Sequence, residues 1–293
     1  MSIRSSPLKQ IARHNQLLRF SSNGQPLERS QVPQDYVEAV KWYRKAAEHG
    51  DFFAQNNLGR AYAAGHGIQQ DYAQAAAWYR KAAEQGYAQA QINIGMAYDT
   101  GQGVKQDHTQ ASIWYRHAAE KGWAEGQYHL ALALMVGSGV PQNIKEAMLQ
   151  FQKAAEQGDV ESEYMLGSIY EEGGLGRIVN EPDGSSRVLL PSENAPVPKD
   201  YGLAAKWYRK AAEQGKALAQ NGLGRLYADG KGVPQDYVEA YFWLSLATAS
   251  GSHSSTNGVD DRDLVASHLT KTVLLETQGR ARNWFEDHPA KPQ

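Results

Sequence analysis

Apolar residues recur along the chain at the spacing of an amphipathic helix. In the first clear segment they stand at i, i+3, i+4, i+7 and i+11, which places them on one face of a helix with 3.6 residues per turn. Asp35 precedes this segment as an N-cap, with Glu38 three residues later, and Gly50 follows it where a left-handed residue ends a helix. The pattern therefore predicts a helix between Asp35 and Gly50. Its apolar face consists of Tyr36, Ala39, Val40, Tyr43 and Ala47.

A second apolar segment, with Ala54, Leu58 and Tyr62, predicts a second helix after the first. It carries a small residue near its middle, Gly59, and a mid-helix glycine costs up to about 1 kcal/mol. Because that cost is tolerable where another helix must approach closely, we predict that this position serves packing. The small residue recurs as Gly95, Ala131, Gly167 and Gly224.

Two glycines, Gly65 and Gly67, follow the second helix and recur in most later units. They are superficially similar to phosphate-binding glycines, but no strand precedes them and no third glycine opens the following helix. We therefore interpret them as inter-helix turns.

The two-helix unit repeats with a period of 36 residues, which is the sequence signature of a helical array. One step, from Val140 to Val197, is 21 residues longer than the others. We expect residues 32–251 to form five full repeats and a sixth opening helix. The units begin at Val32, Ile68, Val104, Val140, Val197 and Val233.

The long step marks an insertion near residues 177–196. Two short aliphatic runs flank Pro182, Asp183 and Gly184, a turn signal that predicts a small hairpin. Two interpretations stay open. The insertion is a partner-specific contact, because extra segments in solenoids emerge on one face, or it is a tolerated solvent loop, because lengthening a loop costs little.

Both ends of the chain depart from the repeat. Residues 1–31 form a basic arm, for which a degenerate capping helix and a frayed tail both stay open. Residues 252–293 are expected to cap the array. Gly251–Asp260 is predicted as a polar loop, followed by helices over Asp261–His268 and from Lys271 to about Asp287. The apolar residues expected to cover the end of the stack are Leu274, Leu275, Ala281, Trp284 and Phe285.

The repeat resembles the Sel-one-like repeat, a relative of the tetratricopeptide repeat. The resemblance extends from Val32 to about Gly251, and the fourth unit departs from it with Gln150 and Phe151 in place of Trp-Tyr. It implies an all-α, right-handed α/α superhelical solenoid of helix-turn-helix repeats with a concave groove. The residues that carry it in the first unit are Asp35, Tyr36, Ala39, Trp42, Tyr43, Ala46, Ala47, Gly50, Ala54, Leu58, Gly59, Tyr62, Gly65 and Gly67.

The resemblance also implies a role, because members of this family mostly act as adaptors for proteins or peptides. Some are involved in envelope homeostasis, signalling or bacterium–host contact. A cysteine-rich branch has been linked to β-lactam binding through folds that depend on disulfides. This chain has no cysteine, so that role does not transfer.

Composition removes several classes of function. Lys and Arg number 30 and Asp and Glu number 32, so the net charge of −2 provides no field that favours nucleic acid. The absence of cysteine excludes disulfides, thiolate zinc sites, iron–sulfur clusters and cysteine nucleophiles. The nine histidines lack metal-binding spacing and no Gly-x-Ser-x-Gly motif occurs, so we expect no metal, no cofactor and no enzymatic activity. No apolar run spans a bilayer and no export signal is evident, which favours a cytoplasmic location unless a leader has been removed.

Two columns of the first helices are candidates for binding a partner. The tryptophans at the edge of the core face either pack against the neighbouring unit or anchor a bound chain. The arginines either pair with the glutamate four residues later or donate to a partner's carboxylates. Three asparagines of the second helices are further donors for a peptide backbone. The candidates are Trp42, Arg44, Asn57, Trp78, Arg80, Asn93, Trp114, Arg116, Trp207, Arg209, Asn221 and Trp243.

The sequence thus predicts a non-enzymatic scaffold that binds a protein or peptide on the surface of an α-solenoid. An alternative of another class is an envelope-associated ligand-binding protein or a hydrolase acting on cell-wall material, which family analogy alone supports. A purely structural oligomer is a third alternative.

Overall fold

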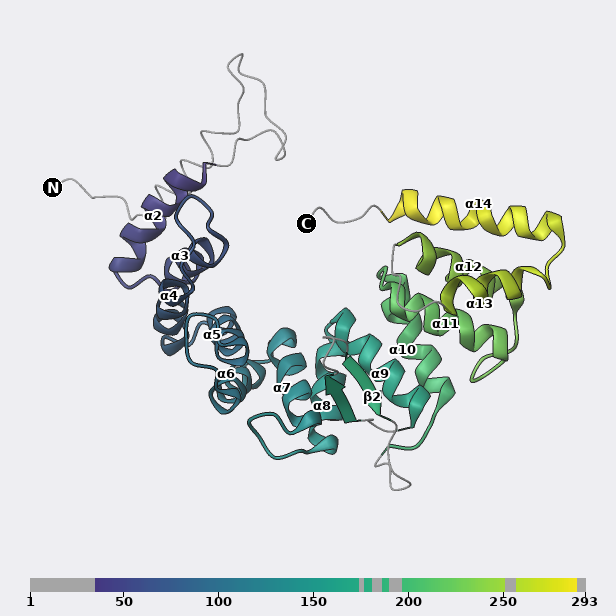
Figure 1. The fold of residues 1–293 in the computed structure, drawn as a ribbon, viewed down its shortest axis with the longest axis horizontal. Helices are drawn as coiled ribbons and strands as arrows, with labels where there is room; N and C mark the ends of the chain where they lie inside the picture. Colours follow the sequence, from purple (N-terminus) through teal and green to yellow (C-terminus); the bar gives the residue numbers. More distant parts are fainter. Residues whose placement is uncertain (1–34, 174–176, 181–185, 190–196, 251–256, 289–293) are drawn as a thin grey trace, which may run out of the picture. The chain divides into compact units, whose positions relative to one another are not determined.

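The computed structural model describes residues 35–173, 177–180, 186–189, 197–250 and 257–288. These residues form helices joined by short turns, apart from one hairpin (Figure 1). The predicted basic arm, residues 1–31, and Gly251 lie outside the described residues. The helices are α2 (Tyr36–Glu48), α3 (Phe52–Ala64), α4 (Tyr72–Glu84), α5 (Ala88–Thr100), α6 (His108–Glu120), α7 (Ala124–Val136), α8 (Ile144–Glu156), α9 (Val160–Glu172), α10 (Tyr201–Glu213), α11 (Ala217–Asp229), α12 (Tyr237–Ala249), α13 (Asn257–Ala266) and α14 (Lys271–Asp287).

The chain divides into two compact units, residues 1–126 and 127–293, with the division near the start of α7. In the first unit, α2 to α5 each pack against the next helix in sequence. In the second unit, α8 packs against α9, and α9 to α12 pack in order. This stacking of consecutive helix pairs is an α-solenoid, the predicted fold class. Within the described ranges, no helix is long and apolar enough to cross a membrane.

Side-chain caps begin the first helices, as the sequence predicts. Asp35 Oδ1 accepts a hydrogen bond from the backbone N–H of Glu38 at 2.9 Å, which satisfies one of the free donors of α2. Asp200 caps α10 in the same way through Leu203, although the acidic capping-box partner is absent there. The side-chain caps of α3 and α9 were not predicted from the sequence. The corresponding residues are Asp71, Asp107, Asn143 and Asp236 for first helices, and Asp51 and Asp159 for second helices.

The mid-helix glycines of the packing column in the second helices lie against large side chains of the next first helix, most of them aromatic. A Cβ atom added at Gly59 would lie 2.7 Å from the ring of Tyr79 on α4, closer than side chains pack. The same approach recurs between Gly95 and Tyr115. The packing function predicted for this column is therefore confirmed. Equivalent contacts join Gly167 to Tyr208 and Gly224 to Leu244.

The glycines after the helices adopt the left-handed conformation that the sequence predicts. Gly50 has φ 89° at the end of α2, and Gly65 and Gly67 have φ 71° and 70°. A Cβ at Gly67 would also clash with the backbone carbonyl of Tyr36, so this turn packs directly against the start of α2. The glycine pairs are inter-helix turns, as interpreted.

A ladder of buried amides runs between the helices. Gln55, on α3, donates from Nε2 to the carbonyl of Ala47 at 3.2 Å and accepts at Oε1 from Gln85 of the following pair at 2.8 Å. Gln157 donates in the same way to Gln127 at 2.8 Å. This column was not predicted from the sequence. Its buried members are Gln55, Gln91, Gln127, Glu163 and Gln220.

The insertion contains the predicted hairpin. Strands β1 (Arg177–Asn180) and β2 (Ser186–Leu189) pair antiparallel, with Arg177 opposite Leu189 and Asn180 opposite Ser186. The turn residues Pro182, Asp183 and Gly184 lie outside the described residues.

The C-terminal helices cap the second unit. Ala281 is buried, and Leu274, Trp284 and Phe285 pack against the core formed by α10, α11 and α12. Two details of the prediction are wrong. Leu275 is 59% exposed, because it lies on the outer face of α14. The expected polar loop is shorter, because α13 begins at Asn257.

Candidate functional site

The tryptophan column divides according to burial. Trp42, Trp78 and Trp114, in the first unit, are half-buried at the edge of the core. Trp207 and Trp243, in the second unit, are only 7% and 4% exposed. Packing against the neighbouring pair accounts for part of this burial, since Trp78 lies against the core of α2 and α3. The first-unit indoles therefore combine a packed edge with an accessible one.

Cations lie over several of these rings. The ammonium group of Lys45 is 4.8 Å from the centroid of the Trp42 ring, and that of Lys81 is 4.1 Å from the Trp78 ring. Residues three apart are neighbours on a helix surface, so the spacing Trp-x-x-Lys produces each contact. In α6, His117 replaces the lysine, with its ring centroid 5.7 Å from that of Trp114. These contacts hold the indoles in defined orientations.

The arginine column binds the tyrosines of the second helices. Arg44 donates to the hydroxyl of Tyr62 at 3.0 Å and Arg80 to that of Tyr98 at 2.7 Å. Arg209 donates to Tyr227. This differs from the expected pairing with the glutamate four residues later. An i, i+4 ion pair in which the arginine precedes the glutamate is the weaker orientation. The tyrosine hydroxyl, in contrast, lies within hydrogen-bond distance of the guanidinium.

Arg116 occupies the same column in α6 and is half-buried. Its repeat has Leu134 where the others have a tyrosine, 18 residues after the arginine. The tryptophan and arginine columns are two residues apart, about 200° around the helix, so they lie on opposite edges of the core stripe. Within a single helix the structure therefore keeps these two predicted sets apart, whereas Arg209 of α10 and Trp243 of α12 line one pocket.

One of the three candidate asparagines, Asn93, forms a hydrogen bond to another helix. Asn93 donates from Nδ2 to Oδ1 of Asn56 at 2.9 Å, which joins α5 to α3. Asn57 and Asn221 are half-buried. Asn221 takes the repeat position of Asn56 and not that of Asn57. Nδ2 of Asn57 is buried without an acceptor among the described residues.

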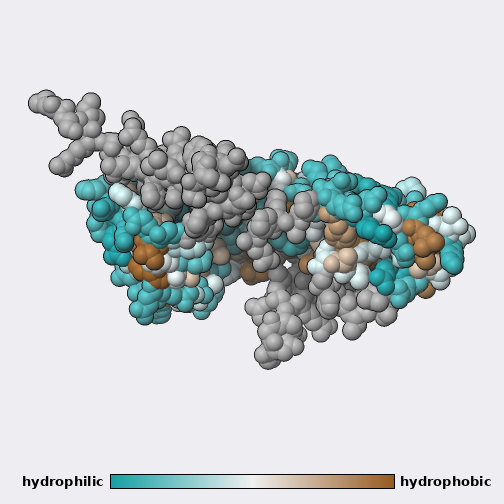
Figure 2. Space-filling view, turned by 90° about the horizontal axis from the view of Figure 1, so that it is seen from above, coloured by the Kyte–Doolittle hydropathy of each residue, from teal (hydrophilic) through white to brown (hydrophobic). Residues whose placement is uncertain are grey.

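One exposed aromatic group escaped the sequence analysis. Phe52 and Phe53, at the start of α3, are 46% and 48% exposed, and their rings lie 5.2 Å and 6.3 Å from that of Tyr87. In the sequence, the two adjacent phenylalanines shortly after Gly50 are the feature that indicates this exposed group. On the face seen in Figure 2, the described residues are mostly hydrophilic, with hydrophobic residues in small separate groups.

The family model of the Sel1 repeat matches most of the chain. The chain belongs to the Sel1 repeat family. The matched segments are residues 22–51, 53–87, 88–123, 124–159, 160–182, 192–216 and 217–252. The complete Sel1 repeats begin on second helices, so each one joins a second helix to the first helix of the next pair. The close contact between Gly59 and Tyr79 is therefore internal to one Sel1 repeat.

Solved structures include similar Sel1 repeat proteins. A Sel1 repeat protein from Oxalobacter formigenes is 30% identical over 88% of this chain and 65% of that chain, with a TM-score of 0.68. This chain thus spans less than two thirds of that relative. Protein c5321, a protective antigen of uropathogenic Escherichia coli with an SLR fold, is 26% identical over 88% of this chain and 76% of that chain, with a TM-score of 0.41. A comparison with curated proteins finds no match.

Most of the titratable groups with shifted pKa values belong to the packing of the Sel1 repeats. Burial raises the pKa of Tyr79 to about 12 and places that of Tyr208 well above its ordinary range. Burial also raises the pKa of the Glu163 carboxyl, which stands in the amide ladder. In the described part of the chain, no group of three or more histidine or acidic residues is placed to hold a metal ion. Sel1 repeat proteins are typically protein-interaction scaffolds and generally non-enzymatic.

Proposed function

We propose that this chain is a non-enzymatic adaptor that binds a protein or peptide through the tryptophan edge of its first unit. The tryptophan edge consists of Trp42, Trp78 and Trp114 with Lys45, Lys81 and His117, on α2, α4 and α6. The observation that carries the proposal is that one half-buried indole recurs on each of three successive first helices. The family's usual role supports the same function.

The tryptophan edge has the properties of a binding surface. Tryptophan is enriched among residues that contribute most to protein association. Trp42 is fixed by the Lys45 cation and by a hydrogen bond from its Nε1 to Glu38 at 3.0 Å. Side chains that are already ordered lose less entropy when a partner binds. The arginine column is less suited to this role, because tyrosine hydroxyls already accept from it. Among the described residues, no observation favours action on cell-wall material.

Site-specific photo-crosslinking tests the proposal. Gln74 is exposed one helical turn before Trp78, so a photoreactive residue at position 74 reports on the tryptophan edge. Met96 is 41% exposed on α5 and provides the matched control on a second helix. In native lysate, we expect one protein to crosslink from position 74 and not from position 96. Lys81→Glu, which removes the cation beside Trp78, is expected to reduce that product.

The result that would contradict the proposal is equal crosslinking from both positions, or a product that Lys81→Glu leaves unchanged. Circular dichroism of each variant shows whether the fold is retained. A partner that crosslinks only from position 96 would assign the binding surface to the second helices.

A further inference from the structure

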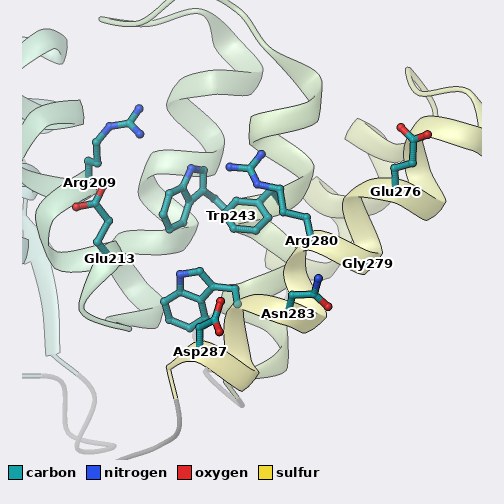
Figure 3. Close-up of a pocket in the computed structure, with 10 residues that line it drawn as sticks. Arg209, Glu213, Trp243, Glu276, Gly279, Arg280, Asn283 and Asp287 are labelled. Carbon is teal, nitrogen blue, oxygen red and sulfur yellow. The ribbon is translucent and has the colours of Figure 1, made fainter.

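The second unit contains a cleft that the sequence did not indicate. It has a volume of about 720 Å³, within the range of pockets that hold ligands, and lies where α14 packs beside α12 and the end of α10. Figure 3 shows Arg209 and Glu213 on one side of Trp243, and Arg280 on the other. The lining residues are Arg209, Glu213, Phe242, Trp243, Glu276, Gly279, Arg280, Asn283, Trp284 and Asp287.

The positive charges in the cleft are engaged within the fold. Arg280 donates to both carboxylate oxygens of Glu239, at 2.5 Å and 3.3 Å, and stacks over the Phe242 ring at 3.9 Å from its centroid. Arg209 donates to the hydroxyl of Tyr227. Arg280 therefore acts here as part of the wall, with its charge balanced by Glu239.

The carboxylates of the lining are not balanced in this way. Glu213 and Asp287 are exposed and form no ion pair within the described ranges, and the same is true of Glu276. In Figure 3, Glu276 lies at the opposite end of α14 from Asp287. With Arg280 neutralised by Glu239 and Glu276 set apart, the rest of the lining has two carboxylates, Glu213 and Asp287, and one guanidinium, that of Arg209. This charge distribution is complementary to a cation.

The walls supply the other contacts that a basic side chain requires. Phe242, Trp243 and Trp284 provide ring faces and edges that accommodate aliphatic stems and attract cations. Trp243 is 4% exposed, and its indole Nε1–H is buried without an acceptor in the described part of the chain. A buried donor without a partner is costly, and a backbone carbonyl of a bound segment satisfies it once the side chains that cover this N–H move aside on binding.

We propose that this cleft binds a lysine- or arginine-containing segment of a partner protein. The basic side chain lies against the aromatic wall with its charge toward Glu213 and Asp287, and a backbone carbonyl of the segment accepts from Trp243. The site lies on α10, α12 and α14 of the second unit. It is therefore separate from the tryptophan edge of the first unit, and it goes beyond the function proposed for that edge.

Titration with two short peptides tests the site. The probes are acetyl-tetralysine amide and, as the charge-reversed control, acetyl-tetraglutamate amide. The readouts are calorimetric affinity and the indole ¹H–¹⁵N signal of Trp243, assigned by its loss in Trp243→Phe. We expect the lysine peptide to bind and to shift that signal. We expect the glutamate peptide to do neither.

Paired variants locate the charges. Glu213→Gln with Asp287→Asn is expected to weaken binding of the lysine peptide about tenfold, which corresponds to about 1.4 kcal/mol, because two ion pairs are lost. Glu84→Gln is the matched control, since Glu84 holds the position of Glu213 in α4, and it is expected to leave the affinity unchanged. Trp243→Phe keeps a ring but removes the donor, so it is expected to weaken binding about fivefold.

The assignment is overturned if the Trp243 signal stays in place at saturation, or if Glu84→Gln weakens binding as much as the double variant. Tighter binding of the glutamate peptide would overturn it too. Crosslinking at position 74 is measured independently, so failure of this site and failure of the proposed adaptor edge are distinguishable.

Discussion

At the scale of single residues, Glu163 is the acidic member of a buried column that glutamines otherwise occupy. Gln55, Gln91 and Gln220 each donate an amide N–H to the end of the preceding helix, at 3.2, 3.2 and 3.1 Å. An ionised carboxylate cannot donate. Glu163 is 3% exposed and accepts from Gln214 at 2.8 Å. The substitution thus leaves a negative charge in a position built for a neutral amide, and burial raises the pKa of that carboxyl.

We predict that Glu163→Gln stabilises the protein at neutral pH by about 1 kcal/mol, because the amide restores the missing donor. Since its pKa is raised on folding, the native carboxyl binds its proton more tightly than the unfolded one does. The stability of the parent is therefore fully present below the unfolded pKa and falls as pH rises through the folded pKa. The gain from Glu163→Gln should grow over that interval. Urea unfolding at a series of pH values measures it.

The reciprocal change, Gln127→Glu, serves as the control. Gln127 holds the same column and accepts from Gln157 at 2.8 Å, so a carboxylate there should destabilise the protein and introduce the same pH dependence. An identical pH slope for the parent and Glu163→Gln would contradict this account of the column.

At the scale of elements, the contact between neighbouring helices depends on glycines facing rings. A Cβ atom added at Gly59 would lie 2.7 Å from the ring of Tyr79. Tyr79 is only 8% exposed, so its ring is fixed in the core. Gly279, also within a helix, faces open space on α14. The two positions are alike in backbone conformation and different in surroundings, so they separate packing from helix propensity.

We predict that Gly59→Ala destabilises the first unit by a net of about 1 kcal/mol. The added methyl forces Tyr79 aside at a cost of about 1–3 kcal/mol, and the better helix propensity of alanine offsets up to about 1 kcal/mol. Gly279→Ala gains the propensity without the clash and should stabilise by about 0.5–1 kcal/mol. Thermal unfolding distinguishes the two. If both substitutions stabilise, the close approach is not what selects glycine at Gly59.

Several of the repeating features were predicted well from the sequence. Helix starts at aspartates, left-handed glycines and the small packing column each recur at the same step, so the pattern itself indicates their function. The bonds from Arg44 to Tyr62 were missed because they join two helices 18 residues apart, which helical periodicity within one element does not reveal. The cleft was missed because it depends on α14, whose direction across α12 no repeated pattern specifies.

At the scale of the whole molecule, each helix pair is stabilised mainly by its neighbours, so the ends of the array need special cover. In the second unit α14 provides it. Gln278 donates to the hydroxyl of Tyr241 at 3.0 Å, Arg280 binds Glu239, and Ala281 is buried against the core at 8% exposure. The same helix closes one side of the proposed cleft, so capping and binding depend on one element.

We predict that Ala281→Asp loosens α12 and the adjacent helices while leaving α3 to α5 unaffected. An aspartate at Ala281 places an unpaired charge against apolar side chains, which costs about 2–4 kcal/mol, and in a one-dimensional array that cost is confined to nearby elements. Leu275→Asp is the matched control on the same helix, because Leu275 is 59% exposed and its replacement removes little packing. Amide hydrogen exchange should therefore accelerate in α10 to α12 for Ala281→Asp and not for Leu275→Asp. Equal acceleration in α3 to α5 would mean that the two units unfold together and that the contacts of α14 stabilise the whole chain.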